Sequence, residues 1–351
     1  MKTSFCVTKK RSGILLFVRI AFLVFIVLQN NLLLAQSFDI PSSEYGISFG
    51  NSKYFTGLRF NLIDKHVDRI TGVNVTFWKS QENEDAVMRG ISLGIIPEAG
   101  DMGYLQIGVA GVGATHNLMG ISMGVLGVGA GGDVTGINIG GLGAGSGGSV
   151  TGISIGGLGV GCGKDLTGIN IGGLGAGAGG DVRGFTLGLF GAGAGQDLWG
   201  ITIGGLGVGA GEDVFGITLG GLGAGAGERM TGINIGGLGV GAGEELSGLS
   251  IAALGAGSPH IKGITIGGLA VGGVEITGIT LSAAHVRIED DGILTGFAFS
   301  AFNFVKGLVR GVTLGIVNYA YEVNGIQLGL VNYVADNPSG LKVLPLFNTN
   351  F

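Results

Sequence analysis

Apolar and polar residues alternate through most of the chain, in a unit that recurs every 16 residues. Residues 136–151 form one such unit and read G-I-N-I-G-G-L-G-A-G-S-G-G-S-V-T. A period of two is typical of a β-strand whose two faces differ. We predict that Ile137 and Ile139 face the interior, that Asn138 faces solvent, and that Val150 adds a further inward position. After the Gly140-Gly141 pair, a second strand carries small inward residues such as Ala144.

The repeat is regular enough to predict the fold class. The first glycine of the unit stands at 120, 136, 152, 168, 184, 200, 216, 232 and 248, and later units begin at 263, 278, 296, 311 and 325. One unit is too short to bury a core alone, but stacked units can bury one between them. We predict an all-β fold, a parallel β-solenoid of about 16 residues per coil with irregular capping ends.

An outer-membrane β-barrel is the alternative fold and function. The final Phe351 and the partly alternating apolar residues before it resemble the last strand of such a barrel. However, a barrel strand needs about 9–11 residues, so a 16-residue hairpin leaves too few. Pro345 also interrupts the last strand.

The organisation along the chain follows the quality of the repeat. We expect a signal peptide at 1–35, an N-terminal cap with degenerate repeats at 36–119, regular repeats at 120–262, and irregular repeats with a C-terminal cap at 263–351. The two end regions contain most of the aromatic residues and a polar insertion, as capping repeats should.

The first 35 residues indicate export. An apolar run from Ile20 to Leu28 follows the basic residues Lys2, Lys9, Lys10, Arg11 and Arg19, and the segment Q-N-N-L-L-L-A then leads to a cleavage point after Ala35. An uncleaved membrane anchor is the alternative. Cleavage would remove five of the 19 basic residues and leave 14 against 24 acidic ones, a net charge of −10. That balance argues against a nucleic-acid partner, which requires clustered basic residues.

Three motifs that suggest chemistry fall inside the repeat. Gly152, Ser154 and Gly156 match the G-x-S-x-G elbow of hydrolases, but the aligned positions hold Ser, Asn or Thr, and a nucleophile cannot be exchanged for Asn. Cys162 stands where other units have Ser or Ala, so we expect a small inward residue there. G-x-G-x-x-G strings such as the one that starts at Gly143 lack the helix that a phosphate site needs.

Acidic residues recur at the turn of each unit. Asp133, Asp165, Asp181, Asp197 and Asp213 form a row that Ser149 and Arg229 interrupt. The row faintly resembles calcium-binding solenoids, but those repeat every nine residues, so we expect a solvated turn. The four histidines lack ligand spacing. We therefore predict no catalytic, cofactor-binding or metal site, no cofactor and no enzymatic activity. An enzyme on a solenoid, which needs clustered carboxylates, and an ice-binding face, which needs regular Thr ladders, are weaker alternatives.

The second strand of each unit has only glycine on its outward side. Gly143 and Gly145 leave that side as almost bare backbone, which would let another layer approach closely. We expect a cell-envelope or other surface partner at this glycine-lined face, or self-association through it. Relief of crowding at tight corners is the alternative reason for these glycines.

Tandem G-I-x-I-G-G-L-G-V-G-A-G units, with the segment G-I-Q-L-G-L-V-N from Gly325 to Asn332, resemble a family of bacterial glycine-rich surface-repeat proteins over most of residues 57–351. The resemblance implies an exported location at the cell surface, outer membrane or periplasm, and it carries over no functional residue. The predicted function is a non-enzymatic structural or binding scaffold of the cell envelope.

Overall fold

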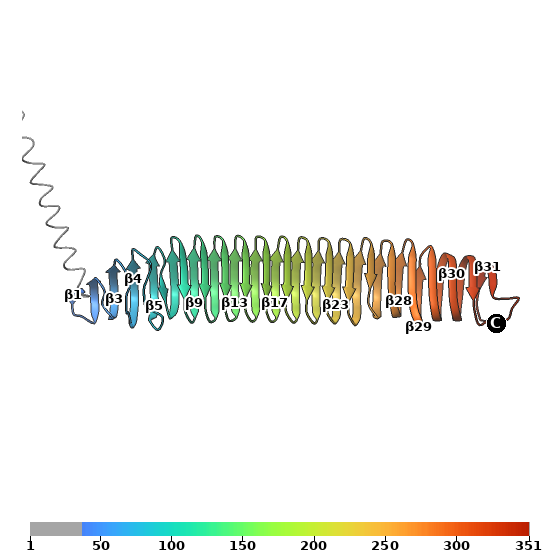
Figure 1. The fold of residues 1–351 in the computed structure, drawn as a ribbon, viewed down its shortest axis with the longest axis horizontal. Helices are drawn as coiled ribbons and strands as arrows, with labels where there is room; N and C mark the ends of the chain where they lie inside the picture. The colour runs from blue at the N-terminus through green and yellow to red at the C-terminus, as the bar shows by residue number, and fades with distance from the viewer. Residues whose placement is uncertain (1–36, 351) are drawn as a thin grey trace, which may run out of the picture.

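The chain forms a straight stack of β-coils. A computed structural model describes residues 37–350, and Figure 1 shows them as one rod that runs from β1 to β31. The predicted signal peptide lies outside the described residues. Within residues 37–350 the chain has no helix of the length and apolar character that a membrane span requires.

Most coils contain a long strand and a short strand. The first coils hold β1 (Phe38–Pro41), β2 (Tyr45–Phe49), β3 (Tyr54–Asn61), β4 (Arg69–Thr76), β5 (Val87–Gly94), β6 (Glu98–Ala99), β7 (Asp101–Gly108) and β8 (Gly111–Ala114). The long strands that follow are β9 (Leu118–Gly124), β11 (Val134–Gly140), β13 (Val150–Gly156), β15 (Leu166–Gly172), β17 (Val182–Gly188), β19 (Leu198–Gly204), β21 (Val214–Gly220), β23 (Arg229–Gly236) and β25 (Glu245–Ala252).

The short strands alternate with them along the chain. They are β10 (Gly127–Ala130), β12 (Gly143–Ser146), β14 (Gly159–Cys162), β16 (Gly175–Ala178), β18 (Gly191–Ala194), β20 (Gly207–Ala210), β22 (Gly223–Ala226), β24 (Gly239–Ala242) and β26 (Gly255–Gly257). The last coils comprise β27 (His260–Gly267), β28 (Ala270–Ser282), β29 (His285–Phe299), β30 (Phe302–Val334) and β31 (Val343–Asn348).

Neighbouring coils pair in parallel and in register. Ile137 of β11 lies beside Ile153 of β13, and Ala144 of β12 lies beside Val160 of β14, so each pair is 16 residues apart. Antiparallel pairing occurs at the two ends, between β1 and β2 and between β30 and β31. Of the two architectures expected from the sequence, the chain has the parallel β-solenoid.

Glycine is required at two points of each coil. Gly152 has a φ of +123°, and a Cβ atom there would lie 2.2 Å from the carbonyl oxygen of Gly136. Gly156 ends the long strand, and its Cβ would lie 1.9 Å from the carbonyl oxygen of Gly159. An L side chain rarely adopts the first conformation and cannot fit at the second. The tight corner between the two strands therefore depends on glycine.

The core is thin and lies between the long and short strands. Val134, Val150, Leu166 and the equivalent residues of other coils are buried, as are Ala144 and Val160 of the short strands. The predictions for Val150 and for the Ala/Val positions are confirmed.

The prediction for the middle of the long strand is wrong. The side chains of Asn138 and Ser154 are buried, whereas Ile137 and Ile153 are each 37% exposed. Val150 and Ser154 are four residues apart on one strand, and a period of two places both on the same side. We attribute the inward side of the strand to the crowding at Gly156. The corner leaves no room for a Cβ on the inward side there, so the even positions face inward and the isoleucines at odd positions point outward.

Candidate functional site

The inward polar residues form a continuous column through the solenoid. In β9 to β25 the column consists of Ser122, Asn138, Ser154, Asn170, Thr186, Thr202, Thr218, Asn234 and Ser250, all of them buried. The side-chain polar atoms of Asn138, Asn170 and Thr202 have no hydrogen-bond partner among the described residues. Burying such groups without a partner disfavours folding. The predicted solvent-facing polar ladder is therefore an internal one.

Ser154 does not occupy the site that its motif suggested. Its hydroxyl is buried in the middle of β13 and has no hydrogen-bond partner among the described residues. A strand, β14, and not a helix, follows the motif. A nucleophile needs an exposed turn and a base within hydrogen-bond reach. The geometry supports a packing role for Ser154.

Cys162 lies half-buried on β14 against the hydrophobic core, as a small inward residue should. Burial raises the pKa of its thiol, and the nearby carboxylate of Asp165 acts in the same direction, against hydrogen bonds that involve the backbone of Val150 and Lys164. A reactive cysteine requires a lowered pKa, because the thiolate is the nucleophile.

The row of acidic turns connects one coil to the next. The Oδ1 atom of Asp133 accepts a hydrogen bond from the backbone N–H of Ser149 at 2.8 Å, and that of Asp181 accepts one from the N–H of Asp197 at 3.1 Å. These carboxylates satisfy backbone donors at the edge of the stack, a role that the sequence did not reveal. Among the described residues, no group of three or more His, Cys, Asp or Glu is arranged to hold a metal ion.

The outward side of the short strands is lined with glycine, as predicted. Gly143, Gly159 and Gly175 are partly exposed on the short strands. A Cβ at these three positions would lie 3.3–3.5 Å from the nearest carbonyl oxygen, whereas the corner glycines would clash at about 2 Å. None of the three has a positive φ. Intrachain packing therefore leaves room for a Cβ at these three positions, whereas at Gly145 and Gly177 of the same face a Cβ would lie 2.8 Å from a carbonyl oxygen, so crowding explains part of the glycine-lined face.

The long strands present an apolar surface that we name the isoleucine face. In β9 to β25 it consists of two adjacent columns, Ile121, Ile137, Ile153, Ile169, Phe185, Ile201, Ile217, Ile233 and Leu249, and Met123, Ile139, Ile155, Ile171, Leu187, Ile203, Leu219, Ile235 and Ile251. Sequence reasoning missed this surface because it assigned both columns to the core. The even spacing between Val150 and Ser154 was the signal that could have found it.

The N-terminal end contains a buried ion pair. Arg59 and Asp64 are 0% and 1% exposed and contact each other through Nη1 and Oδ1. Arg59 also donates to Asn74 at 2.8 Å and through Nε to Ser52 at 3.1 Å. Asn61 and Asn74 donate to Asp64 at 3.0 and 2.7 Å. Arg59 lies in the inward polar column, between Ser48 and Asn74. The paired charges are therefore part of the column near its N-terminal end.

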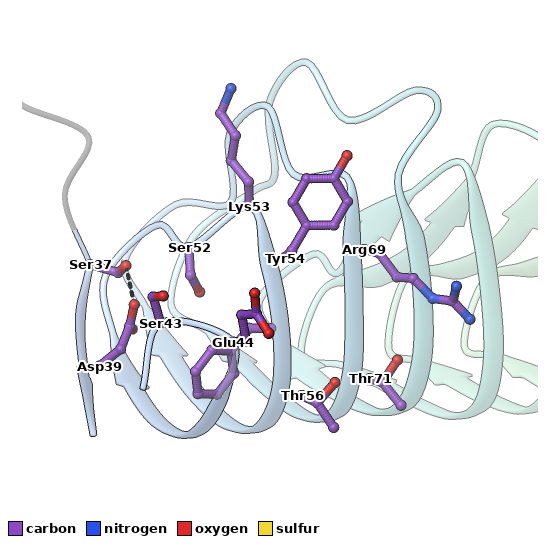
Figure 2. A pocket seen from close by; sticks show the side chains of 11 residues that line it. Ser37, Asp39, Ser43, Glu44, Ser52, Lys53, Tyr54, Thr56, Arg69 and Thr71 are labelled. Carbon is purple, nitrogen blue, oxygen red and sulfur yellow. Dashed lines mark hydrogen bonds between the residues drawn. The ribbon is translucent and has the colours of Figure 1, made fainter. Parts of the chain in front are cut away.

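A hollow of about 770 Å³ lies near this ion pair at the N-terminal end. Asp39, Glu44, Lys53 and Arg69 line it together with smaller polar residues. Figure 2 shows Ser37 bonded to Asp39, at 2.7 Å, and Lys53 pointing away at the rim. The lining mixes both charges.

Comparison with known proteins adds no neighbour. No family model, curated protein or solved structure matches this chain.

Proposed function

We propose that the chain is an exported, non-enzymatic structural scaffold of the bacterial cell envelope, which acts as a rigid spacer or a binding rod. The observation that carries the proposal is the continuous parallel pairing of coils from β2 to the start of β30, which makes a single straight rod (Figure 1). Rods built of stacked repeats present long surfaces at fixed spacing, and each repeat contacts only its neighbours.

Two sequence features support export and a scaffold role. The basic and apolar N-terminal segment is typical of a secretory signal. The residues of the G-x-S-x-G column interchange among Ser, Asn and Thr and are buried, which suits packing and not chemistry. The glycine-lined face is the surface that we propose for a cell-envelope partner, because intrachain packing does not require glycine at Gly143, Gly159 and Gly175.

Fractionation of cells that express the full chain tests the proposal. We expect the protein outside the cytoplasm, with Gln36 as its first residue by mass spectrometry. A cytoplasmic protein that still begins at Met1 would contradict export. Removal of two whole coils, residues 152–183, should give a shorter rod that is still folded. Unfolding of that deletion variant would contradict a spacer built from interchangeable units.

A further inference from the structure

The isoleucine face is too large to be an ordinary solvent-exposed surface. Its two columns contain no charged residue from Ile121 to Ile251, and the exposed leucines at the adjacent corner, such as Leu142 and Leu158, extend it. A soluble monomer rarely exposes a contiguous apolar patch above a few hundred Å². The two columns cover about 14 Å of each long strand, and nine such strands spaced about 4.8 Å apart make the face about 600 Å² before the leucine corner is added.

That area matches what a stable dimer buries. Two such faces in contact would remove at least about 1,200 Å² from water, which is the lower end of the range of specific protein interfaces. The isoleucine face is also complementary in shape to the same face of a second copy. In both copies the isoleucine columns run parallel to the coil stack, so the columns of one copy can pack beside the columns of the other. Sheets that pack in this way lie about 10 Å apart.

Charge along the edges distinguishes a second copy from a lipid surface. The turn before most long strands carries the acidic row, including Asp181, Asp197 and Asp213, whereas the corner after the strand carries leucines. The acidic edge opposes an anionic membrane. A two-fold axis parallel to the coil stack would place the acidic row of each copy beside the leucine corner of the other and keep the two acidic rows apart.

We propose that the isoleucine face binds a second copy of this chain, with the two rods parallel and related by a two-fold axis along the stack. The dimer closes because the same face is used on both copies. This inference holds wherever the protein is located, so it stands apart from the proposed export.

The test compares matched pairs of lysine substitutions in the full chain, purified without detergent from whichever cell fraction contains it. I169K/I201K places charges in the face. S149K/Q196K adds the same charge at turn positions where other coils have Arg229 and Lys164. We expect sedimentation to give twice the chain mass for the unaltered protein and for S149K/Q196K. For I169K/I201K we expect a monomer, with dimer affinity reduced by about a hundredfold or more, because unpaired charges would be buried.

Two further measurements keep the proposal falsifiable. If I169K/I201K unfolds, I169T/I201T must weaken the dimer instead, since Thr already occupies outward positions of these strands. With both native cysteines replaced by alanine, I121C should cross-link between copies through a short bismaleimide, because parallel rods place the two 121 positions opposite each other on sheets about 10 Å apart. A monomeric unaltered chain, a dimer that survives the lysines, or absence of the cross-link would overturn the proposal. Binding of a monomer to phosphatidylcholine vesicles that I169K/I201K abolishes would assign the face to lipid and overturn it too.

Discussion

The Oδ1 atom of Asp165 accepts a hydrogen bond from the backbone N–H of Asp181, one coil further along, at 3.0 Å. Asp181 repeats the contact with Asp197, and Asp197 repeats it with Asp213. Asp213 bonds in turn to the N–H of Arg229 at 3.0 Å and to its guanidinium group. A charged acceptor strengthens a hydrogen bond. The acidic row therefore joins consecutive coils along one edge, and it is more than a solvated turn.

Replacing Asp197 by alanine should destabilise the protein by about 1–2 kcal/mol, because the N–H of Asp213 would lose a charged acceptor. Urea denaturation followed by circular dichroism measures the change. D197N keeps an oxygen at Oδ1 and should recover about half of the loss. E212A is the control, because the Glu212 side chain is exposed. An equal loss in D197A and E212A would contradict the role of the row.

Replacing Thr202 by valine should stabilise the protein by about 1 kcal/mol or more, since the buried hydroxyl has no partner among the described residues and valine has the same shape. T202S keeps the hydroxyl, loses a methyl group and should lower the melting temperature. If T202V instead lowers the melting temperature, the Thr202 hydroxyl forms a hydrogen bond in solution, and the inward polar column is not short of hydrogen-bond partners.

Replacing Tyr104 by glycine should stabilise the N-terminal coils. Tyr104 has a φ of 84° in a column where the neighbouring coils have Gly90 and Gly120, and its side chain is 69% exposed. Backbone strain of this kind costs about 1–2 kcal/mol. Y104A retains the Cβ atom and should gain much less than Y104G. Thermal unfolding of the unaltered protein, Y104G and Y104A measures this strain, and equal melting temperatures would show that Tyr104 is not strained.

The sequence was sufficient to predict the class of fold. A period of 16, alternation within the unit and glycine pairs between two short apolar stretches predict stacked coils, and the observed pairing of Ile137 with Ile153 has that spacing. The inward positions of Val150 and Ala144 also followed from alternation. These features are local, so one unit contains the information that specifies them.

What the sequence did not reveal depends on contacts between strands. Hydropathy favours isoleucine inside and asparagine outside, whereas the closed corner at Gly156 fixes the opposite phase. The Asp165–Asp181 bond joins residues of different coils, and no pattern within one unit indicates it. The Arg59–Asp64 pair joins β3 to the loop that follows it, and that loop occurs once and is not part of the repeat. The isoleucine face went unrecognised because the sequence pattern alone placed its two columns inside.

Three threonine substitutions on the short strands test what the outward glycines do. G143T, G159T and G175T together should leave the fold intact and raise stability by about 0.4–1 kcal/mol each, since a Cβ fits there and glycine costs entropy on folding. G140T and G156T are the contrast and should unfold the protein, with a Cβ only 1.9 Å from a carbonyl oxygen. If the outward triple variant folds and its association with the cell envelope is unchanged, the glycine-lined face is not a contact surface.

Small-angle X-ray scattering tests the central claim, a straight solenoid, most directly. Residues 37–350 contain about 19 stacked coils at about 4.8 Å each, so we expect a rod of about 90 Å with a radius of gyration of about 27 Å. A parallel dimer would widen the rod and leave its length unchanged. A compact fold of this size would give a radius of gyration of about 20 Å, and that value would contradict the account.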